Sequence, residues 1–365
     1  MPRAVLMTEP GRPLTVEDVD VADPGPGELR VRIAASGVCH SDVHVFESGA
    51  ATIPKPVVLG HEAAGEILQV GPGTDNFAVG DHVVLCVFPQ CGVCTFCMTG
   101  YPTLCDAKAK LAGATMMDGT TRLSLNGQPV WQMAGLGTYC EETIVSALSA
   151  VVIDPSMPLV SAALLGCGVV TGYGAVTNVG NVGRGDTVAI TGCGGLGLNA
   201  IQASRIVGAD RIIAIDRVAG KLRAAKTLGA TDIVDASAGD AVEQVRQLTG
   251  GLGVHVALDF VGVAKTAADA LAMTRRGGTA VLTGLAEPIM EFSINELVRA
   301  GRQIKGNLMG MGWFRDEFPK LVRLYQEGQL KLDELVSKRL DLTEVDLAFA
   351  AMSDGDVARS VLVMN

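Results

Sequence analysis

The chain has 365 residues, 48% of them hydrophobic and 19% charged, which is the composition of a folded protein long enough for about two domains. A net charge of −10 and a pI near 5.0 disfavour nucleic acid and anionic membrane surfaces as partners, because both bind basic faces. The chain has no run of about 18 apolar residues, and polar residues follow the first apolar segment too soon for a signal peptide, so we expect a cytoplasmic protein without a membrane span.

The first part of the chain, up to about residue 155, alternates short strand-like segments with turns. Residues 1–7 have the pattern of a first strand, and the segments 29–33, 66–70 and 82–85 follow it. Proline and glycine at 24–27 and at 71–73 punctuate these segments. The pattern predicts an antiparallel, barrel-like domain with irregular loops.

The pattern of apolar and polar residues changes after Leu164, where a helical stretch precedes apolar strands that alternate with amphipathic helices. We expect strands at 187–191, 211–216, 254–261 and 278–283, and a helix at about 195–207 between the first two. Apolar strands separated by helices predict a parallel sheet covered on both faces, and therefore an α/β fold. From about Asn307 the rhythm loosens, which predicts that the chain returns to its first domain.

A glycine-rich turn follows the expected strand at 187–191. Gly192, Gly194 and Gly197 form the pattern G-x-G-x-x-G between that strand and a helix, and Asp216 ends the next strand 19 residues beyond Gly197. This context is typical of a dinucleotide site, and a packing turn in an unrelated α/β protein is the less favoured alternative. The Asp216 carboxylate would bind ribose hydroxyls and repel a 2′-phosphate, which favours NAD over NADP. The adjacent Arg217 could partly accommodate that phosphate, although a solvated surface arginine is the simpler interpretation.

Nine cysteines are present, and four of them have the spacing C-x-x-C-x-x-C-x7-C at Cys91, Cys94, Cys97 and Cys105. An odd count without a secretion signal favours metal thiolates over disulfides. Four thiolates on one loop can close a tetrahedron around Zn²⁺ and leave no open position, so we expect a structural zinc site. An iron–sulfur cluster also takes four cysteines, but its usual spacings differ from this one.

Three further potential ligands are scattered along the chain. Cys39 lies in the segment GVCHSDVH, His61 in GHEAAG and Cys167 in GCGVVTGYG. Each residue alone would more often be a buried cysteine or a core histidine than a ligand. Their local settings change that expectation for each residue.

With the four-cysteine loop and the glycine turn, these three segments closely resemble the zinc-dependent medium-chain alcohol dehydrogenases. The resemblance covers essentially the whole chain and includes residues 80–83, 118–120 and 357–363. It implies a GroES-like irregular β-barrel catalytic domain, residues 1–168 and 308–365, that holds both zinc sites. It also implies a doubly wound Rossmann domain, residues 169–307, that binds NAD, and a homodimer joined through those domains or a tetramer.

The resemblance further implies reversible hydride transfer between NAD and a primary or secondary alcohol, giving an aldehyde or a ketone. Cys39, His61 and Cys167 would hold a zinc ion whose fourth position is open to the substrate oxygen. Ser41 would take the proton of the alcohol, and His44 would deliver it to solvent.

Two acids stand beside these ligands. By the same resemblance, Asp42 would orient His61 through its second ring nitrogen, and Glu62 would lie next to the zinc. Positions expected to contact the cofactor, besides the turn and the following acid, are His40, Thr171, Gly195, Leu196, Lys221 and Arg359. Many relatives have arginine at the position of His40, so the histidine predicts weaker phosphate binding and faster NADH release.

Val87, Met133, Leu111 and Leu308 match positions that line the substrate pocket in this family. Several relatives that favour ethanol have phenylalanine at the first two, so the smaller or more flexible side chains here predict a bulkier alcohol, aromatic or terpenoid. A glutathione-adduct formaldehyde dehydrogenase is a neighbouring possibility, for which Lys108 and Lys110 are the local candidates to bind the anion.

Three alternatives differ in class. A metal-free quinone or enone reductase would lack the zinc ligands, whereas all seven are present. A redox-sensing zinc protein would be expected to have lost the proton relay or the cofactor turn. A nicotinoprotein, which keeps NAD(H) bound and uses an external electron acceptor, stays open at this point.

Overall fold

The computed structural model describes residues 1–49, 53–111, 113–285, 289–353 and 358–364. The chain forms two compact units. The first unit comprises Met1–Gly168, Gly312–Gly328 and Leu332–Asn365, and the second comprises Val169–Met311 and Gln329–Lys331. The last part of the chain therefore belongs mostly to the first unit.

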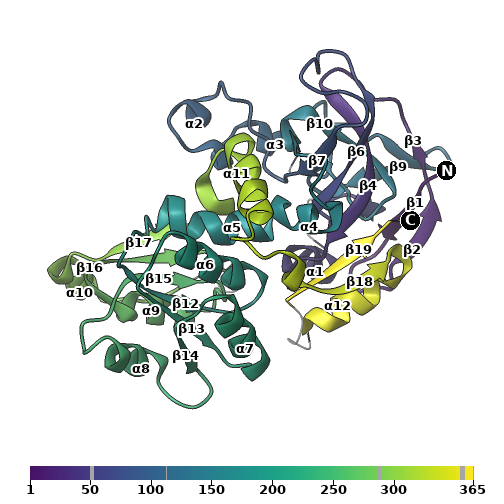
Figure 1. Ribbon diagram of the computed structural model, residues 1–365. Helices are drawn as coiled ribbons and strands as arrows, with labels where there is room; N and C mark the ends of the chain where they lie inside the picture. The colour runs from purple at the N-terminus through teal and green to yellow at the C-terminus, as the bar shows by residue number, and fades with distance from the viewer. Residues whose placement is uncertain (50–52, 112, 286–288, 354–357, 365) are drawn as a thin grey trace. The chain divides into compact units, whose positions relative to one another are not determined.

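Two sheets enclose the core of the first unit and form a barrel-like structure (Figure 1). One has the order β2 (Thr15–Asp18), β1 (Arg3–Met7), β5 (Val57–Val58), β9 (Gln128–Gln132), β8 (Leu123–Leu125) and β3 (Asp20–Val21). The other has the order β11 (Ala150–Val152), β7 (His82–Leu85), β6 (Glu62–Val70), β4 (Glu28–Gly37), β19 (Arg359–Val363) and β18 (Val336–Asp341), and β10 (Glu142–Ser146) also pairs with β4. Because β19 pairs antiparallel with β4, the end of the chain lies beside the segment that leads to Cys39.

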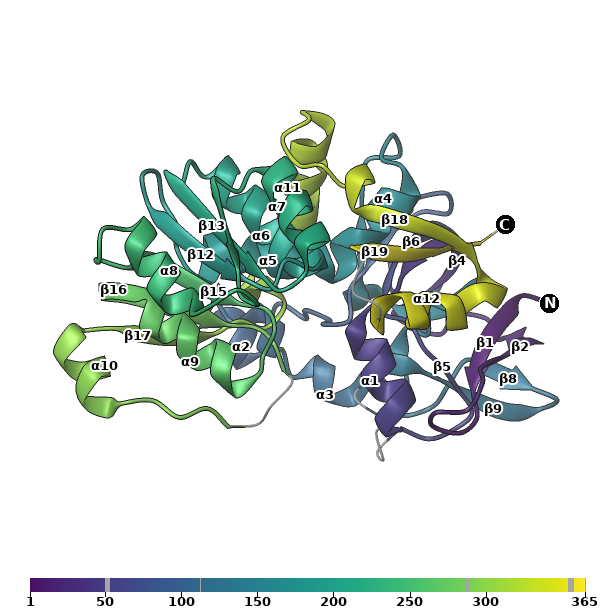
Figure 2. The same ribbon diagram turned by 90° about the horizontal axis from the view of Figure 1, so that it is seen from below.

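The second unit contains a six-stranded sheet in which every pair of neighbours is parallel. Its order is β14 (Asp232–Asp235), β13 (Arg211–Asp216), β12 (Thr187–Thr191), β15 (Val254–Asp259), β16 (Thr274–Leu282) and β17 (Gln303–Gly306). The order reverses direction at β12, which is the doubly wound arrangement that creates a binding crevice at the carboxyl ends of the central strands. Crossovers between parallel strands are right-handed as a rule, which places the helices of the two halves on opposite faces, and Figure 2 shows helices around the sheet.

The helices complete each unit. Those of the first unit are α1 (His40–Ser48), α2 (Thr95–Met98), α3 (Ala107–Leu111), α4 (Leu159–Ala163), α11 (Phe314–Gln326) and α12 (Val345–Ser353). Those of the second are α5 (Gly168–Gly174), α6 (Gly195–Ile206), α7 (Ala219–Leu228), α8 (Ala241–Leu248), α9 (Ala264–Met273) and α10 (Ile294–Ala300). Within the described residues, no single helix is long and apolar enough to cross a bilayer, whereas one bent pair, Leu159–Gly166 with Gly168–Val179, meets that criterion by length and composition.

Most of the strands expected from the sequence are present, and the differences lie at their ends. The segments 82–85, 187–191 and 211–216 are strands with those bounds. The expected strand at 254–261 ends at Asp259, where the Asp259 carboxylate accepts the N–H groups of Val261 and Gly262 and turns the chain. The strand expected at 278 begins at Thr274, and β14 and β17 were not expected because both are short, half-exposed strands without a continuous apolar run.

Candidate active site and metal centres

Cys39, His61 and Cys167 come together in the first unit. One ligand atom from each lies within 4.8 Å of the others, and all three side chains are buried. Cys39 precedes α1, His61 precedes β6, and Cys167 follows a short helical turn that ends at Gly166. A Cβ at Gly166 would lie 2.4 Å from the carbonyl oxygen of Leu85, so only glycine lets that turn approach the sheet and bring Cys167 to the other two.

Asp42 connects two of these ligands. Its Oδ1 lies 2.9 Å from His61 Nδ1 and accepts the Gly60 N–H at 3.2 Å. Its Oδ2 accepts the Cys39 N–H at 3.1 Å and the Tyr139 hydroxyl at 3.0 Å. Because Asp42 engages Nδ1, the Nε2 atom of His61 is the one that can bind a metal. Burial alone would lower the pKa of His61, but the charge and hydrogen bond of Asp42 raise it well above its usual value.

The two sulfur atoms of this cluster compete for protons. A hydrogen bond from Cys167, supported by His61 and opposed by burial, holds the pKa of Cys39 well below its usual value. The same hydrogen bond, together with burial, raises the pKa of Cys167 well above its usual value. A dication would stabilise both thiolates at once, and two thiolates with one imidazole form a donor set that suits Zn²⁺ with one position left open.

Cys91, Cys94, Cys97 and Cys105 form a second cluster, with their sulfur atoms within 4.8 Å of one another. The Cys91 N–H donates to Cys105 Sγ at 3.3 Å, and the Cys94 N–H donates to Cys91 Sγ at 3.4 Å. Burial raises the pKa of Cys97 to about 12, whereas the Cys97 N–H lowers the pKa of Cys94 to about 6. Four unbridged sulfur atoms at such close range with N–H donors directed at them fit a closed tetrahedral zinc site.

The glycine turn of the second unit follows β12 directly. Gly192 has a φ of +90°, and a Cβ at Gly197 would lie 1.9 Å from the Gly192 carbonyl oxygen, so the turn and α6 approach too closely for a side chain. Gly194 has open space where its Cβ would lie. The Cys193 N–H donates to Asp216 Oδ2 at 2.8 Å, which draws that carboxylate against the turn. A tight turn, an open face and an acid at the end of the next strand fit a dinucleotide pyrophosphate and its ribose.

Comparisons with known proteins show which family the chain belongs to. Residues 25–155 match the alcohol dehydrogenase GroES-like domain, and residues 195–327 match the zinc-binding dehydrogenase domain. An NDMA-dependent alcohol dehydrogenase of Amycolatopsis methanolica is 39% identical over 99% of this chain and 98% of its own. The chain belongs to the zinc-binding medium-chain alcohol dehydrogenases.

Solved structures share the complete fold of this alcohol dehydrogenase. An alcohol dehydrogenase zinc-binding domain protein from Burkholderia ambifaria has a TM-score of 0.95 and 32% identity, and covers 100% of this chain and 99% of its own. Benzyl alcohol dehydrogenase from Acinetobacter calcoaceticus has a TM-score of 0.92 and 28% identity, with the same coverage. The chain is therefore a zinc-dependent oxidoreductase of the alcohol dehydrogenase type.

Glu62 and Arg359 form a buried ion pair beside the three-ligand cluster of the dehydrogenase. Arg359 Nη2 lies 3.5 Å from Glu62 Oε2, and Arg359 Nη1 donates to the Val38 carbonyl oxygen at 3.2 Å. Neither Glu62 oxygen has a hydrogen-bond partner among the described residues, nor does Arg359 Nη2. Burial raises the pKa of Glu62 to about 7, against the opposing charge of Arg359. Polar atoms left unpaired in a buried site are groups available to a ligand or an ion.

The proposed relay residues lie on α1, which Cys39 precedes. Ser41 Oγ is 3.8 Å from Cys39 Sγ, so the structure brings this hydroxyl to the ligand cluster. His44 is exposed one turn further along the same helix, and His40 is exposed at its first residue. Ser41 and His44 are three residues apart, so they lie on one side of α1, and both are exposed.

The other residues of the second unit that were expected to contact the cofactor have different surroundings. The Thr171 hydroxyl donates to Met309 Sδ at 3.3 Å, so it has a protein partner already. Gly195 and Leu196 begin α6, and Lys221 is half-buried on α7. Arg217 is exposed, and its backbone N–H donates to Asp216 Oδ1 at 2.7 Å.

The expected pocket residues lie in both units. In the first unit, Leu111 lies against the turn at Met133–Gly135, because a Cβ at Gly135 would be 2.8 Å from Leu111 Cδ2. Val87 is half-buried and packs against the core cluster that contains Leu136. Leu308 is half-buried in the second unit.

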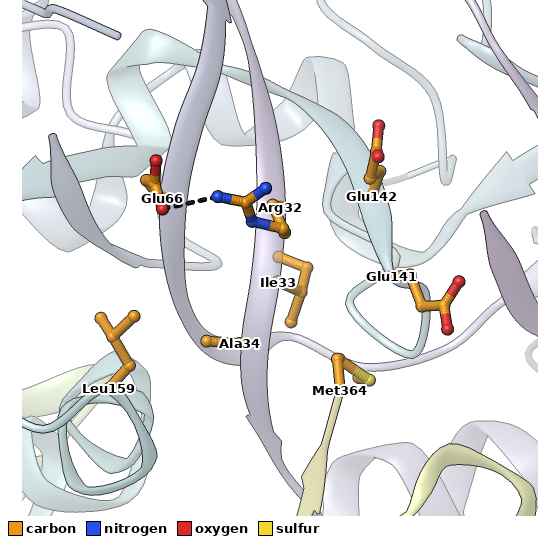
Figure 3. A pocket seen from close by; sticks show the side chains of 8 residues that line it. All are labelled: Arg32, Ile33, Ala34, Glu66, Glu141, Glu142, Leu159 and Met364. Carbon is orange, nitrogen blue, oxygen red and sulfur yellow. Dashed lines mark hydrogen bonds and ion pairs between the residues drawn. The ribbon is translucent and has the colours of Figure 1, made fainter. Parts of the chain in front are cut away.

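A pocket of about 330 Å³ in the first unit lies beside β4, and none of these residues lines it (Figure 3). Its carboxylates are paired, since Glu66, Glu141 and Glu142 form ion pairs with Arg32, Arg3 and Arg30, each at 2.7 Å. The protein itself therefore neutralises these charges.

Tyr139 is the residue of this site that the sequence analysis missed. It is fully buried, yet its hydroxyl reaches Asp42 across 97 positions of the chain. A tyrosine between small and polar residues at 135–143 has no local pattern that could have indicated this contact.

Proposed function

We propose that this dehydrogenase transfers hydride reversibly between NAD and a primary or secondary alcohol, giving an aldehyde or a ketone. We also propose that residues 1–168 and 308–365 form the catalytic domain and residues 169–307 the NAD-binding domain. The observation that carries the proposal is the three-ligand cluster, whose chemistry leaves one zinc position for substrate. When bound, zinc would supply Lewis acidity at the substrate oxygen, and NAD would supply the hydride acceptor.

Asp216 supports NAD as the cofactor. Its two oxygens accept the backbone N–H groups of Cys193, Arg217 and Val218, which hold the carboxylate in place. An ionised carboxylate binds ribose hydroxyls and repels a phosphate there. Comparing kcat/KM for NAD and NADP with one alcohol tests this, and equal values would contradict it.

Ser41, His44 and Glu62 supply the proton chemistry in this proposal. The Ser41 hydroxyl would accept the proton of the substrate hydroxyl, and the exposed His44 would release it to solvent. Asp42 would hold His61 in the orientation and tautomer that leave Nε2 for the metal. The Glu62 carboxylate, buried and paired with Arg359, would balance the charge of the cluster.

We further propose that the preferred alcohol is bulky, either aromatic or terpenoid. Val87, Leu111, Met133 and Leu308 are aliphatic, and a relative of the same fold acts on benzyl alcohol by its name. Unbranched methionine and small valine leave more adaptable space than phenylalanine does. A kinetic series from ethanol through hexanol to benzyl alcohol tests the preference, and the highest kcat/KM for ethanol would overturn it.

A nicotinoprotein, with NAD(H) permanently bound and an external electron acceptor, is the second candidate. The observation in its favour is that a relative 39% identical is named an NDMA-dependent alcohol dehydrogenase. Absorbance of reduced nicotinamide that persists in the protein after gel filtration and alcohol addition would support it. Turnover that requires added NAD, from protein that carries no nucleotide, would support the exchangeable cofactor instead.

We propose that the chain assembles as a homodimer, with a tetramer as the larger alternative, through the edge of the second unit at β17. Leu285, Ile289, Ile294 and Val298, which precede β17 along the chain, are between 71% and 86% exposed. A sheet edge flanked by exposed aliphatic side chains is a surface for self-association. Light scattering after gel filtration, with Val298→Lys as the variant, measures the oligomer.

We also propose a reducing, cytoplasmic compartment, because all nine cysteines are unbridged.

A further inference from the structure

We propose that Tyr139 is a positioning residue for the catalytic metal site, acting through Asp42 on Cys39 and His61. The inference rests on the proposed function in one respect, that Cys39, His61 and Cys167 hold zinc. It assigns the buried tyrosine hydroxyl the task of fixing the carboxylate that holds two of these ligands.

Every acceptor site of the Asp42 carboxylate is occupied by a neighbouring group. Oδ2 accepts the Cys39 N–H at 3.1 Å and the Tyr139 hydroxyl at 3.0 Å, while Oδ1 accepts the Gly60 N–H at 3.2 Å and faces His61 Nδ1 at 2.9 Å. A carboxylate offers about four acceptor sites, so these contacts fill it. Asp42 is 0% exposed, and no solvent can replace a lost donor without entering the core.

Two of these contacts of Asp42 are made with proposed metal ligands. One fixes the imidazole of His61, and the other fixes the backbone of Cys39 at the start of α1. If the carboxylate rotates, both ligands lose their support together. The Tyr139 hydroxyl opposes that rotation, because it binds the same oxygen as the Cys39 N–H from a distant segment of the chain.

Tyr139 is itself held in place by backbone hydrogen bonds and by the packing of its ring. Its N–H donates to the Leu59 carbonyl at 3.0 Å, and its carbonyl accepts the Val5 N–H at 2.8 Å. Its ring lies against Gly60, where a Cβ would be 2.5 Å away, and against Phe349, with ring centroids 6.4 Å apart. Phenylalanine would fill the same space, so packing alone does not require the hydroxyl, whose partner is Asp42.

The test removes that hydroxyl and measures the metal rather than turnover. Removing a group that orients a zinc ligand typically costs about 10- to 100-fold in metal affinity. Tyr139 acts one contact beyond Asp42, so we expect Tyr139→Phe to release one zinc per chain about 10-fold faster to a chromogenic chelator. The zinc of the four-cysteine cluster, released separately, serves as the internal reference.

Tyr325→Phe is the matched control. The Tyr325 hydroxyl also donates to a carboxylate, that of Asp333 at 3.0 Å, which contacts no proposed ligand. We expect this variant to release zinc at the wild-type rate. Cobalt substitution gives a second readout, because thiolate-to-cobalt absorption reports ligand geometry: Tyr139→Phe should shift the band, and Tyr325→Phe should leave it in place.

Asp42→Asn, alone and combined with Tyr139→Phe, tests the route. Residues in one hydrogen-bond network have non-additive effects, so the double variant should lose little more than Asp42→Asn alone. A wild-type release rate and cobalt spectrum for Tyr139→Phe would overturn the inference, and additive effects would overturn the route through Asp42. If Tyr139→Phe does not fold, wild-type release rate and spectrum in Asp42→Asn would still overturn it. One zinc per chain in the wild type would instead overturn the proposed function itself.

Discussion

Alanine at Gly194 and at Gly197 should separate cofactor binding from folding, although the two glycines belong to one turn. A Cβ at Gly197 would lie 1.9 Å from the Gly192 carbonyl oxygen, whereas ordinary contact begins at 3.4 Å. The turn and α6 would therefore have to move apart by about 1.5 Å. Overpacking of this kind costs about 1–3 kcal/mol, and a backbone partner places it at the upper end. Alanine gains about 1 kcal/mol over glycine within a helix.

Gly197→Ala should therefore lower the free energy of unfolding by about 2 kcal/mol. Each kcal/mol of lost stability lowers Tm by about 2–4 °C in a unit of this size. Gly194→Ala should behave differently, because Gly194 has a φ of −81° and no atom within 4 Å of its Cβ position. Alanine is a poorer N-cap by about 1 kcal/mol, and the reduced freedom of the unfolded chain offsets about 0.4–1 kcal/mol of that. Stability should hardly change.

NADH binding should be weakened by Gly194→Ala, even though that variant hardly changes stability. The alanine methyl group would occupy the face that the pyrophosphate approaches, so we expect NADH affinity to fall at least about 10-fold, or ~1.4 kcal/mol. Calorimetric NADH titration and thermal unfolding measure the two effects separately. Gly183→Ala is the control, since a Cβ there would meet only Asp186 Oδ2, at an ordinary contact distance of 3.7 Å. Wild-type NADH affinity in Gly194→Ala, or wild-type stability in Gly197→Ala, would refute the reasoning.

Four further predictions concern the metals and the cofactor. Cys97→Ser should remove one zinc per chain and lower Tm, because the four-cysteine loop has little core of its own; unchanged zinc content would contradict this. Cys167→Ser should remove the other zinc and abolish alcohol oxidation while the four-cysteine zinc stays, as metal analysis can show. Asp216→Asn should raise kcat/KM for NADP relative to NAD about 10-fold, or ~1.4 kcal/mol, because a negative charge is lost; an unchanged ratio would refute the assignment. His40→Arg should slow NADH dissociation in stopped flow, because a guanidinium is a permanent cation with several N–H donors for phosphate, and an unchanged rate would show that His40 does not face phosphate.

The four-cysteine loop and the glycine turn could be predicted from the sequence. Cys91, Cys94, Cys97 and Cys105 lie on one loop, so their spacing alone indicates a closed metal site. Gly192, Gly194 and Gly197 likewise lie within one turn between a strand and a helix. Neighbours along the chain must be neighbours in space, and short motifs therefore carry their own geometry.

The three-ligand cluster depended on more than local spacing. Cys39, His61 and Cys167 could be joined only through the family resemblance, because each segment alone is compatible with a core cysteine or histidine. The structure brings their ligand atoms within 4.8 Å, and it does so through close backbone approaches such as that of Gly166 to Leu85.

By itself, the amino-acid sequence determined the α/β class, the four-cysteine loop, the glycine turn and the alternation of strands that places Asp216 at a strand end. The tertiary structure alone decided the contacts between distant segments. It placed the Tyr139 hydroxyl on Asp42 and set Arg359 against Glu62 by pairing β19 with β4. The physical reason is that strand pairing and buried hydrogen bonds join residues that share no local periodicity, so only the folded chain shows which polar groups satisfy one another.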